Sequence, residues 1–346
     1  MRPIAYISLF VMALGLAACQ NTSLPRAEAS ESERFKVAGD QVFEDVYEGP
    51  GNVLHSLMIL DEGKVVYEKW NIGYSPDQLQ VMWSISKTFT ALAVGFAQQE
   101  GLLHTEDKVM DYFDRSELPS EPDSLLDGLT LHDLLIMSSG LSDCSYRTMK
   151  GEVQDWAMTA LCEKFCFKPG EMFQYNNMNA YILSVIISRL TGMKMAEYLN
   201  RKLFVPLGIE DYHWLESPQG YNAGGWGLYL TTEDLAKVGQ FFLDRGRWQG
   251  KELLGEDWFV QASYPHIVQY KRLITDPVET DPRDQWRQGY GYQMWNCTDG
   301  AVRMHGAQGQ LCIIFLDKNA VVVTTANCSK DVNILDSIWK NIYPLL

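Results

Sequence analysis

Positive charge is scarce in this sequence. Its 346 residues include 29 Lys and Arg against 44 Asp and Glu, which gives a formal net charge of −15. Such a chain lacks the excess of cations that attracts nucleic acid or the surface of an acidic bilayer. We therefore expect no nucleic-acid partner, and an acidic substrate would need local positive charge where it binds.

Features that would indicate several other functional classes are also missing. The sequence has no internal repeat and no low-complexity tract. It contains no Gly-x-Ser-x-Gly, so the nucleophile elbow of the α/β-hydrolases is absent. Cys162 and Cys166 have no neighbouring histidines at metal-ligand spacing, and we expect neither a metal nor a cofactor. The length allows a large core, in one big domain or in two intertwined ones.

The cysteines are few enough to consider as pairs. Beyond Cys19, the chain has six of them: Cys144, Cys162, Cys166, Cys297, Cys312 and Cys328. An even number permits three disulfides in an exported protein. Because they form two groups of three, either one bond joins the groups or some thiols stay free.

The N-terminus reads as an export signal. Arg2 precedes an apolar stretch over residues 4–18, which is too short for a confident membrane-spanning helix but typical of a secretory signal. The stretch ends in Leu16-Ala17-Ala18-Cys19, which resembles a bacterial lipobox. We predict a signal peptide over 1–18 and a lipid on Cys19, which would anchor an exported protein in a bacterial membrane, the outer membrane, facing the periplasm. A plain signal peptide cut elsewhere is the alternative.

The rest of the chain is predicted to be one domain over 35–346, after a polar, flexible tether over 19–34. Two apolar runs, 53–60 and 64–70, flank Asp61-Glu62-Gly63 and predict a hairpin. Helical periodicity then dominates from about 99 to 225, which predicts a helical lobe.

Strand signals return near the C-terminus. A helix is predicted from Thr232, as a capping residue, to about Gly246. Strand-like runs follow at 289–296, 301–305, 311–316 and 320–326, before a last helix at 331–341. Strands at both ends with helices between them predict an α/β + α fold. Its antiparallel sheet would be flanked by helices, built from both ends of the chain, and interrupted by an inserted all-helical lobe.

A serine and a lysine three residues apart begin an apolar helical run. Ser84-Ile85-Ser86-Lys87 precedes residues 88–96, which are almost wholly apolar. Positions i and i+3 share one helix face, so the Lys87 ammonium is expected to reach back to the Ser84 hydroxyl. A desolvated lysine loses its proton more easily and can activate a serine, which is a weak nucleophile unaided. The free amides of the first helical turn would face a developing oxyanion.

Two later stretches extend this pattern. Tyr175-Asn176-Asn177 follows a turn and precedes an apolar helical run, so a phenol and an amide could point into one cleft. Residues 304–310, Met-His-Gly-Ala-Gln-Gly-Gln, lead into the strand-like run 311–316. Small residues at the start of a strand let the backbone approach a ligand closely.

The first two motifs also occur elsewhere in this chain by chance, at Ser337-Ile338-Trp339-Lys340 and at Tyr198-Leu199-Asn200. All three motifs in this order, however, resemble the penicillin-recognising serine hydrolases. That family includes class C β-lactamases, DD-peptidases, related esterases and 6-aminohexanoate-dimer hydrolases. The resemblance covers nearly the whole mature chain and includes residues 129–141, 206–209, 223–235 and 289–292. It implies a two-lobed fold with the active site between the lobes.

The resemblance also implies a role for each motif residue. Ser84 would be the nucleophile that accepts the acyl group, Lys87 its proton acceptor, and Tyr175 a proton shuttle to the leaving group. Asn177 would orient Lys87 and the substrate. The backbone amides of Ser84 and Gln308 would hold the oxyanion, and water would then hydrolyse the acyl-enzyme.

The third motif departs from the family pattern. Members that recognise β-lactams carry Lys-Thr-Gly or a similar cationic triplet where this chain has His305-Gly306-Ala307. Histidine is mostly neutral near pH 7, so the carboxylate of a penicillin would lose its charged partner. We therefore expect an esterase or amidase, acting on a small ester, amide or peptide, and not an efficient β-lactamase. His305 is a candidate for substrate binding, or else a hydrogen-bonded residue at a strand end with no catalytic role.

Two other functions remain open. One is a β-lactamase or DD-peptidase that acts on β-lactams or peptidoglycan peptides. The other is a lipoprotein that keeps this fold as a non-catalytic binding module. The presence of Ser84, Lys87, Tyr175 and Asn177 together favours an enzyme.

Overall fold

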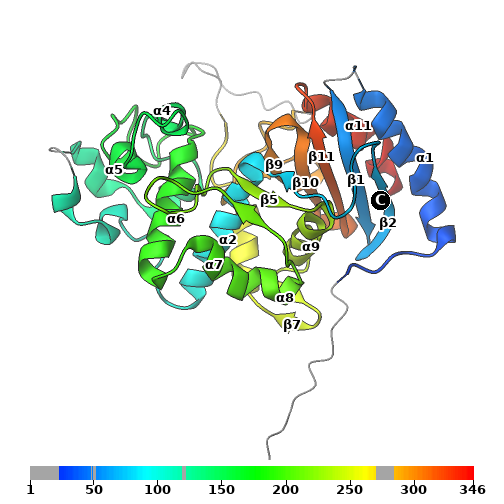
Figure 1. Ribbon diagram of the computed structural model, residues 1–346, viewed down its shortest axis with the longest axis horizontal. Coiled ribbons are helices and arrows are strands. Elements are labelled where there is room, and N and C mark those ends of the chain that lie inside the picture. The colour runs from blue at the N-terminus through cyan, green and yellow to red at the C-terminus, as the bar shows by residue number, and fades with distance from the viewer. Residues whose placement is uncertain (1–22, 48, 50–51, 119–121, 270–283) are drawn as a thin grey trace, which may run out of the picture.

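The computed structural model describes residues 23–47, 49, 52–118, 122–269 and 284–346. A six-stranded sheet has the order β2-β1-β11-β10-β9-β8, and each neighbouring pair is antiparallel. Its strands are β1 Val53–Asp61, β2 Lys64–Trp70, β8 Trp295–Asn296, β9 Val302–Gly306, β10 Gln310–Phe315 and β11 Ala320–Asn327. The first two strands come from the start of the chain, and β1 pairs with the last strand, β11, so both ends of the sequence build one sheet (Figure 1).

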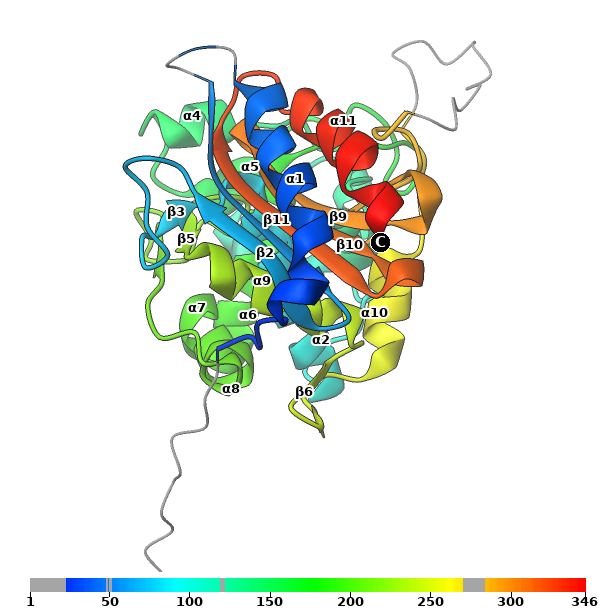
Figure 2. The same cartoon turned by 90° about the vertical axis from the view of Figure 1, so that its right-hand side faces the viewer.

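Helices cover both faces of this sheet. On one face lie α1 (Ala29–Val46) and α11 (Val332–Asn341), side by side in Figure 2. On the other lies α9 (Thr232–Leu243), which contacts the three central strands. Strands covered on both faces read as continuous apolar runs, and the whole of β10 is accordingly buried.

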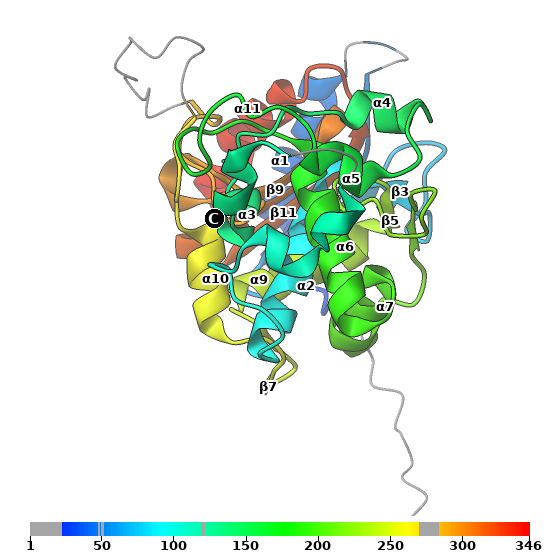
Figure 3. The same cartoon turned by 90° about the vertical axis from the view of Figure 1, so that its left-hand side faces the viewer.

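The remaining helices form the lobe that Figure 3 views from outside. They are α3 Leu131–Leu135, α4 Ser145–Met149, α5 Trp156–Leu161, α6 Asn177–Thr191, α7 Met195–Leu199 and α8 Val205–Leu207. A π-helical turn, Asn200–Phe204, joins α7 to α8. A small sheet of β3 Gln80–Val81, β5 Leu228–Leu230 and β4 His213–Trp214 lies beside this lobe, and α10 (Glu256–Ser263) follows the hairpin of β6 Arg247–Trp248 and β7 Lys251–Glu252.

Helix α2 (Ser86–Gln99) occupies the middle of the molecule. Its residues from Ser86 through Ala97 are all buried, because the lobe packs against it on one side and the sheet with α9 lies on the other. A helix that is apolar all round is expected in such a position. This burial places the residues at its N-terminal end between the lobes.

The predicted fold class is confirmed by this architecture, with several local corrections. The hairpin, the lobe helices and the last helix lie where they were expected. The tether predicted for 19–34 is wrong over its later part, because α1 already begins at Ala29. Many residues of α1 are polar, but one face of the helix, which includes Phe35, Val42 and Val46, is buried. The cap of α9 is the hydroxyl of Thr231, one residue earlier than predicted.

One further expectation differs from the structure. Only Trp295–Asn296 of the run 289–296 forms a strand, since glycines and an irregular turn occupy its first part. Of the two alternatives for the cysteines, disulfides or free thiols, the structure has free thiols at Cys144, Cys162, Cys166, Cys297 and Cys312. The signal peptide over 1–18 and Cys19 lie outside the described residues. Within the described ranges, no helix is both long and apolar enough to cross a bilayer.

Candidate active site

Lys87, the second residue of α2, lies at the centre of the site. Its side chain is 1% exposed. Its Nζ donates three hydrogen bonds, to Ser84 Oγ at 2.9 Å, Asn177 Oδ1 at 2.8 Å and the Gly225 carbonyl at 2.7 Å. All three acceptors are uncharged, so burial is not offset by an ion pair. Burial lowers the pKa of Lys87 to about 7, against a smaller opposing effect of the Asp143 carboxylate.

Ser84 lies just before this helix. It occupies a single 3₁₀ turn, Trp83–Ile85, and the regular helix begins at Ser86. The sequence had suggested that Ser84 opens the helix itself, but the spacing of three still brings the two side chains together. Trp83 holds a left-handed backbone conformation with φ of 47°, which turns the chain sharply into the nucleophile position. Ser84 is half-buried and is therefore reachable from the cleft.

Tyr175 contacts both of these residues. Its ring centroid is 4.8 Å from Lys87 Nζ. Burial raises the pKa of the phenol above its usual value, although a hydrogen bond with Ser84 opposes this. Trp295 stacks on the ring with centroids 5.9 Å apart, and Tyr290 meets it edge-on. Tyr175 is thus held as a protonated phenol between Ser84 and an aromatic wall.

Asn177 is oriented by a loop that the sequence reading had not connected with the site. Its Nδ2 donates to Asp143 Oδ2 at 3.2 Å and to Ser145 Oγ at 3.1 Å. These two acceptors leave its Oδ1 to accept from Lys87. Asp143 and Ser145 follow directly after the segment 129–141, which was the available signal for them.

The Gly225 carbonyl is a further partner that was missed, although residues 223–235 had contributed to the resemblance. A Cβ on Gly225 would lie 2.7 Å from the Asn177 carbonyl oxygen, and one on Gly224 would lie 2.5 Å from the Ala180 carbonyl oxygen. Only glycine permits so close an approach of two backbones. The two glycines therefore let this loop lie directly on the start of α6, where its carbonyl reaches Lys87.

The turn after β9 lies against the Ser84 turn. A Cβ on Gly306 would lie 2.3 Å from the Met82 carbonyl oxygen, so these two backbones are in contact. Gln308, with φ of 65°, accepts a hydrogen bond on Oε1 from the Trp83 indole at 3.2 Å. The structure thus brings Gln308 beside the turn that carries Ser84.

His305 differs from its neighbours because both of its ring nitrogens are already occupied. Its Nε2 lies 3.0 Å from Asp331 Oδ2 on the segment before α11, and its Nδ1 accepts from Arg303 Nε at 3.2 Å. The side chain is 8% exposed. Burial lowers the pKa of His305, so the ring is neutral at pH 7 and Nε2 carries the proton that Asp331 accepts. Direct substrate contact by this ring, as predicted, would require breaking one of these bonds.

Arg303 is a fully buried cation behind the aromatic wall. Its guanidinium stacks 4.5 Å from the Trp286 ring and 5.4 Å from the Trp295 ring, and it donates to the Gln285 carbonyl at 2.6 Å. It therefore supports Trp295, the ring on which Tyr175 stacks. Among the residues whose positions are described, no cluster of His, Cys, Asp and Glu has the arrangement of a metal site.

The family model described as beta-lactamase matches residues 41–342. The chain belongs to the beta-lactamase family. Penicillin-binding protein 4* of Bacillus subtilis (strain 168) is 32% identical over 297 residues, which cover 74% of this chain and 62% of that protein.

Other family members carry different names. The 6-aminohexanoate-dimer hydrolase of Paenarthrobacter ureafaciens is 24% identical over 222 residues, 59% of this chain and 55% of that protein. This chain thus spans less than two thirds of either relative. A solved structure from Bacillus anthracis, assigned as a 6-aminohexanoate-dimer hydrolase, superimposes with a TM-score of 0.72 at 20% identity, over 93% of this chain and 86% of that one. The structural likeness supports the shared fold.

Proposed function

We propose that this protein is a serine hydrolase that cleaves an ester or amide bond through an acyl-enzyme on Ser84. The observation that carries the proposal is the buried lysine. Lys87 has no carboxylate bonded to it, a pKa of about 7, and its Nζ 2.9 Å from Ser84 Oγ. At neutral pH much of this amine is unprotonated and able to accept the serine proton.

The reaction then follows from the positions of the side chains. Ser84 Oγ attacks the carbonyl carbon of the substrate while its proton passes to neutral Lys87. The carbonyl oxygen becomes an oxyanion, which the backbone amides of Ser84 and Gln308 stabilise. Tyr175 protonates the leaving oxygen or nitrogen and regains a proton from Lys87. Water then attacks the acyl-enzyme and gives one proton to neutral Lys87. That proton passes to Ser84 Oγ as the bond to the acyl group breaks, which releases the acid and regenerates Ser84.

The substrate is proposed to be a small ester, amide or peptide, with β-lactams hydrolysed inefficiently. His305 stands where β-lactam-recognising relatives have a cation, and its ring is neutral and bonded to Asp331. Arg303, two residues earlier on the same strand, is fully buried and cannot replace that cation at the surface. A carboxylate-bearing substrate therefore finds no exposed charge on this strand.

Action on β-lactams or peptidoglycan peptides is the second candidate. It is favoured by the 32% identity with a protein named as a penicillin-binding protein. A non-catalytic binding module is less well supported, because a binding module has no need of a lysine buried against a serine hydroxyl.

We also propose that the protein is an exported lipoprotein of a bacterial membrane, anchored through Cys19 and facing the periplasm. The support is the lipobox-like Leu16-Ala17-Ala18-Cys19 after an apolar run. Replacement of Cys19 by serine should then give a soluble exported form that no longer incorporates labelled palmitate.

Variants of two serines test the enzymatic proposal. Ser84→Ala should abolish hydrolysis of p-nitrophenyl butyrate and labelling by a fluorophosphonate, with an unchanged circular dichroism spectrum. Ser337→Ala is the matched control, because Ser337 also begins a Ser-x-x-Lys but bonds to Asp45 on α1 instead. Equal activity of Ser84→Ala and the unaltered protein would exclude this mechanism. Nitrocefin hydrolysis as efficient as ester hydrolysis would favour the second candidate.

A further inference from the structure

The first described residues form a short strap that is fastened across the fold. Pro25 and Ala27 pair with β2, through hydrogen bonds from Val65 N to the Pro25 carbonyl at 2.8 Å and from Ala27 N to the Val65 carbonyl at 2.9 Å. Leu24 is 4% exposed and belongs to the main core. These residues are therefore part of the folded domain and do not act as a flexible linker.

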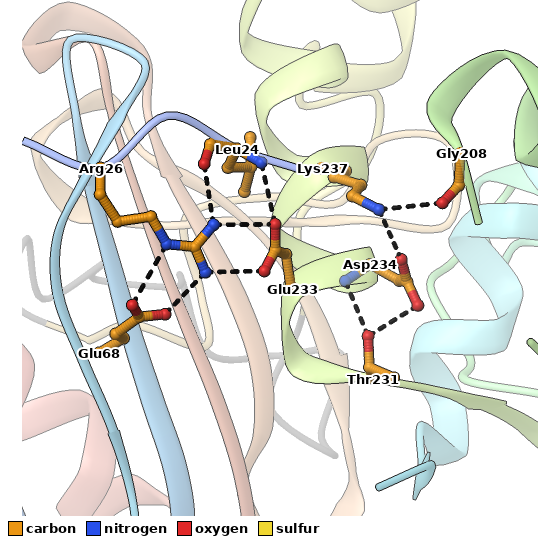
Figure 4. A network of polar contacts seen from close by, with 8 residues as sticks. All are labelled: Leu24, Arg26, Glu68, Gly208, Thr231, Glu233, Asp234 and Lys237. Carbon is orange, nitrogen blue, oxygen red and sulfur yellow. Dashed lines mark hydrogen bonds and ion pairs between the residues drawn. The ribbon is translucent and has the colours of Figure 1, made fainter. Parts of the chain in front are cut away.

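Arg26 fixes this strap at two points, as Figure 4 shows. Its guanidinium lies 2.8 Å from Glu68 on β2 and 2.8 Å from Glu233 on α9. The Leu24 amide also donates to Glu233 at 2.9 Å. Partial burial would raise the pKa of Glu233, but the hydrogen bonds from Arg26 and Leu24 outweigh it and lower that pKa, so the pair stays ionised at neutral pH.

Helix α9, which binds the strap through Glu233, is also hydrogen-bonded to the helical lobe. Lys237 of α9, whose side chain is 7% exposed, lies 2.9 Å from Asp234 and donates to the Gly208 carbonyl after α8 at 3.1 Å. A buried ion pair with a further hydrogen bond holds its partners in one geometry. The helix that binds the strap is thus also hydrogen-bonded to the lobe.

Very little chain separates the strap from the proposed lipid. Four residue steps join Cys19 to Ser23, and each spans at most about 3.6 Å, so the link reaches no more than roughly 14 Å. Ser23 lines a surface hollow together with Gly63 of the β1–β2 turn and Gln249 of the β6–β7 turn. Figure 2 shows the start of the described chain at this lower end of the sheet.

The nucleophile lies at the opposite end of the same sheet. The carbonyl of Asn319, at the start of β11, accepts from Glu62 in the β1–β2 turn, whereas the amide of Cys328, at its end, donates to Gln308 beside Ser84. The strand between them rises by about 3.3 Å per residue, so residues 319 and 328 are roughly 30 Å apart. The strap end and the active-site end are therefore separated by the full length of β11.

We infer that the strap and its short link hold the domain against the anchoring bilayer by the end that contains the β1–β2 turn, with Ser84 directed away from the membrane. The inference rests on the proposed lipid anchor at Cys19. Its functional consequence concerns the substrate, which must arrive from the aqueous phase. Esters that reside in the anchoring leaflet lie beyond the reach of Ser84.

Distance to the membrane can be measured on the full-length lipoprotein in vesicles of phosphatidylethanolamine and phosphatidylglycerol that contain a headgroup-labelled acceptor lipid. A donor dye is attached through an encoded azido amino acid at exposed Lys64, at the strap end, or at exposed Ala307, beside Gln308. The donor at position 64 should be strongly quenched and the donor at 307 much less. Equal quenching at the two positions would overturn the inference.

A longer link provides the matched variant. Ten Gly and Ser residues inserted between Thr22 and Ser23 leave the strap and the site unchanged but add reach. Quenching at position 64 should then fall, and the two positions should become similar. Unchanged quenching after insertion would show that the link does not set the distance.

The substrate consequence is tested with one butyryl ester in two forms, free in solution or attached to a lipid headgroup. The anchored protein should cleave the soluble form at least tenfold faster, and the long-link variant should cleave both. Comparable rates with the natural link would overturn the inference. Mass spectrometry of the mature N-terminus separates the two proposals, because absence of a lipid on Cys19 would refute the anchor itself, whereas a lipidated protein with equal quenching would refute only the orientation.

Discussion

Replacing Lys87 by methionine separates the cost of burying this amine from its role in catalysis. Burial lowers the pKa of Lys87 from 10.5 to about 7 in the folded protein. The unfolded chain therefore binds this proton more tightly, which destabilises the fold at every pH where the unfolded lysine is charged. The free-energy cost is full below pH 7, at about 5 kcal/mol, and disappears as the pH rises from 7 to 10.5.

Methionine removes this titration and also leaves three acceptors without their donor: Ser84 Oγ, Asn177 Oδ1 and the Gly225 carbonyl. That loss costs on the order of 1–3 kcal/mol for each group, but it does not change with pH. The pH dependence of the difference in the free energy of unfolding therefore reports the titration of Lys87. Between pH 7 and pH 9 the unaltered protein should gain about 2 kcal/mol in its free energy of unfolding relative to the Lys87→Met variant.

Urea unfolding of both proteins at pH 7, 8 and 9 measures this difference. The methionine variant should also be inactive, and kcat/KM of the unaltered protein for p-nitrophenyl butyrate should rise with pH through an apparent pKa near 7. A stability difference that is the same at pH 7 and pH 9 would refute the reasoning. Lys87 would then keep its proton throughout this range and could not accept one from the serine.

Three further predictions follow from the neighbours of this lysine. Asp143→Asn removes the carboxylate that raises the pKa of Lys87, so the acid limb of the kcat/KM profile should move to lower pH; a shift to higher pH would contradict this. Gly225→Ala places a Cβ 2.7 Å from a carbonyl oxygen and should reduce kcat/KM at least tenfold, whereas Gly128→Ala, which meets nothing within 4 Å, should leave it unchanged. His305→Lys should not increase nitrocefin hydrolysis, because the acidic partner before α11 would hold the new ammonium; a clear increase would show that this position faces the substrate.

Local spacing was sufficient to predict the parts of the site that lie within one turn. Ser84 and Lys87 are three residues apart, and this spacing brings their side chains together even though the first turn proved to be 3₁₀. The hairpin of β1 and β2 was likewise readable from two apolar runs and a turn. In each case the interacting residues are only a few positions apart in the chain, so the local sequence is sufficient to predict the contact.

Local sequence was not sufficient where only a few residues of a helix are buried, or where two residues in contact are far apart in the chain. The polar residues of 19–34 predict a tether, but α1 begins at Ala29, and its buried residues are spaced among many polar ones. The sequence left His305 as either a substrate-binding residue or a hydrogen-bonded residue at a strand end, because its partner Asp331 lies 26 residues away in the chain. Such pairings are set by the way the strands and helices stack, which no local pattern records.

The sequence by itself determined the family, the fold class and the proximity of Ser84 to Lys87. Only the tertiary structure decided the surroundings that lower the pKa of this lysine. Two of its three acceptors, Asn177 and Gly225, are 90 and 138 residues away, and the burial that lowers its pKa is produced by the lobe closing over α2. The physical reason is that residue spacing determines which side chains meet within one helical turn, whereas the desolvation of Lys87 depends on every element that packs around its amine.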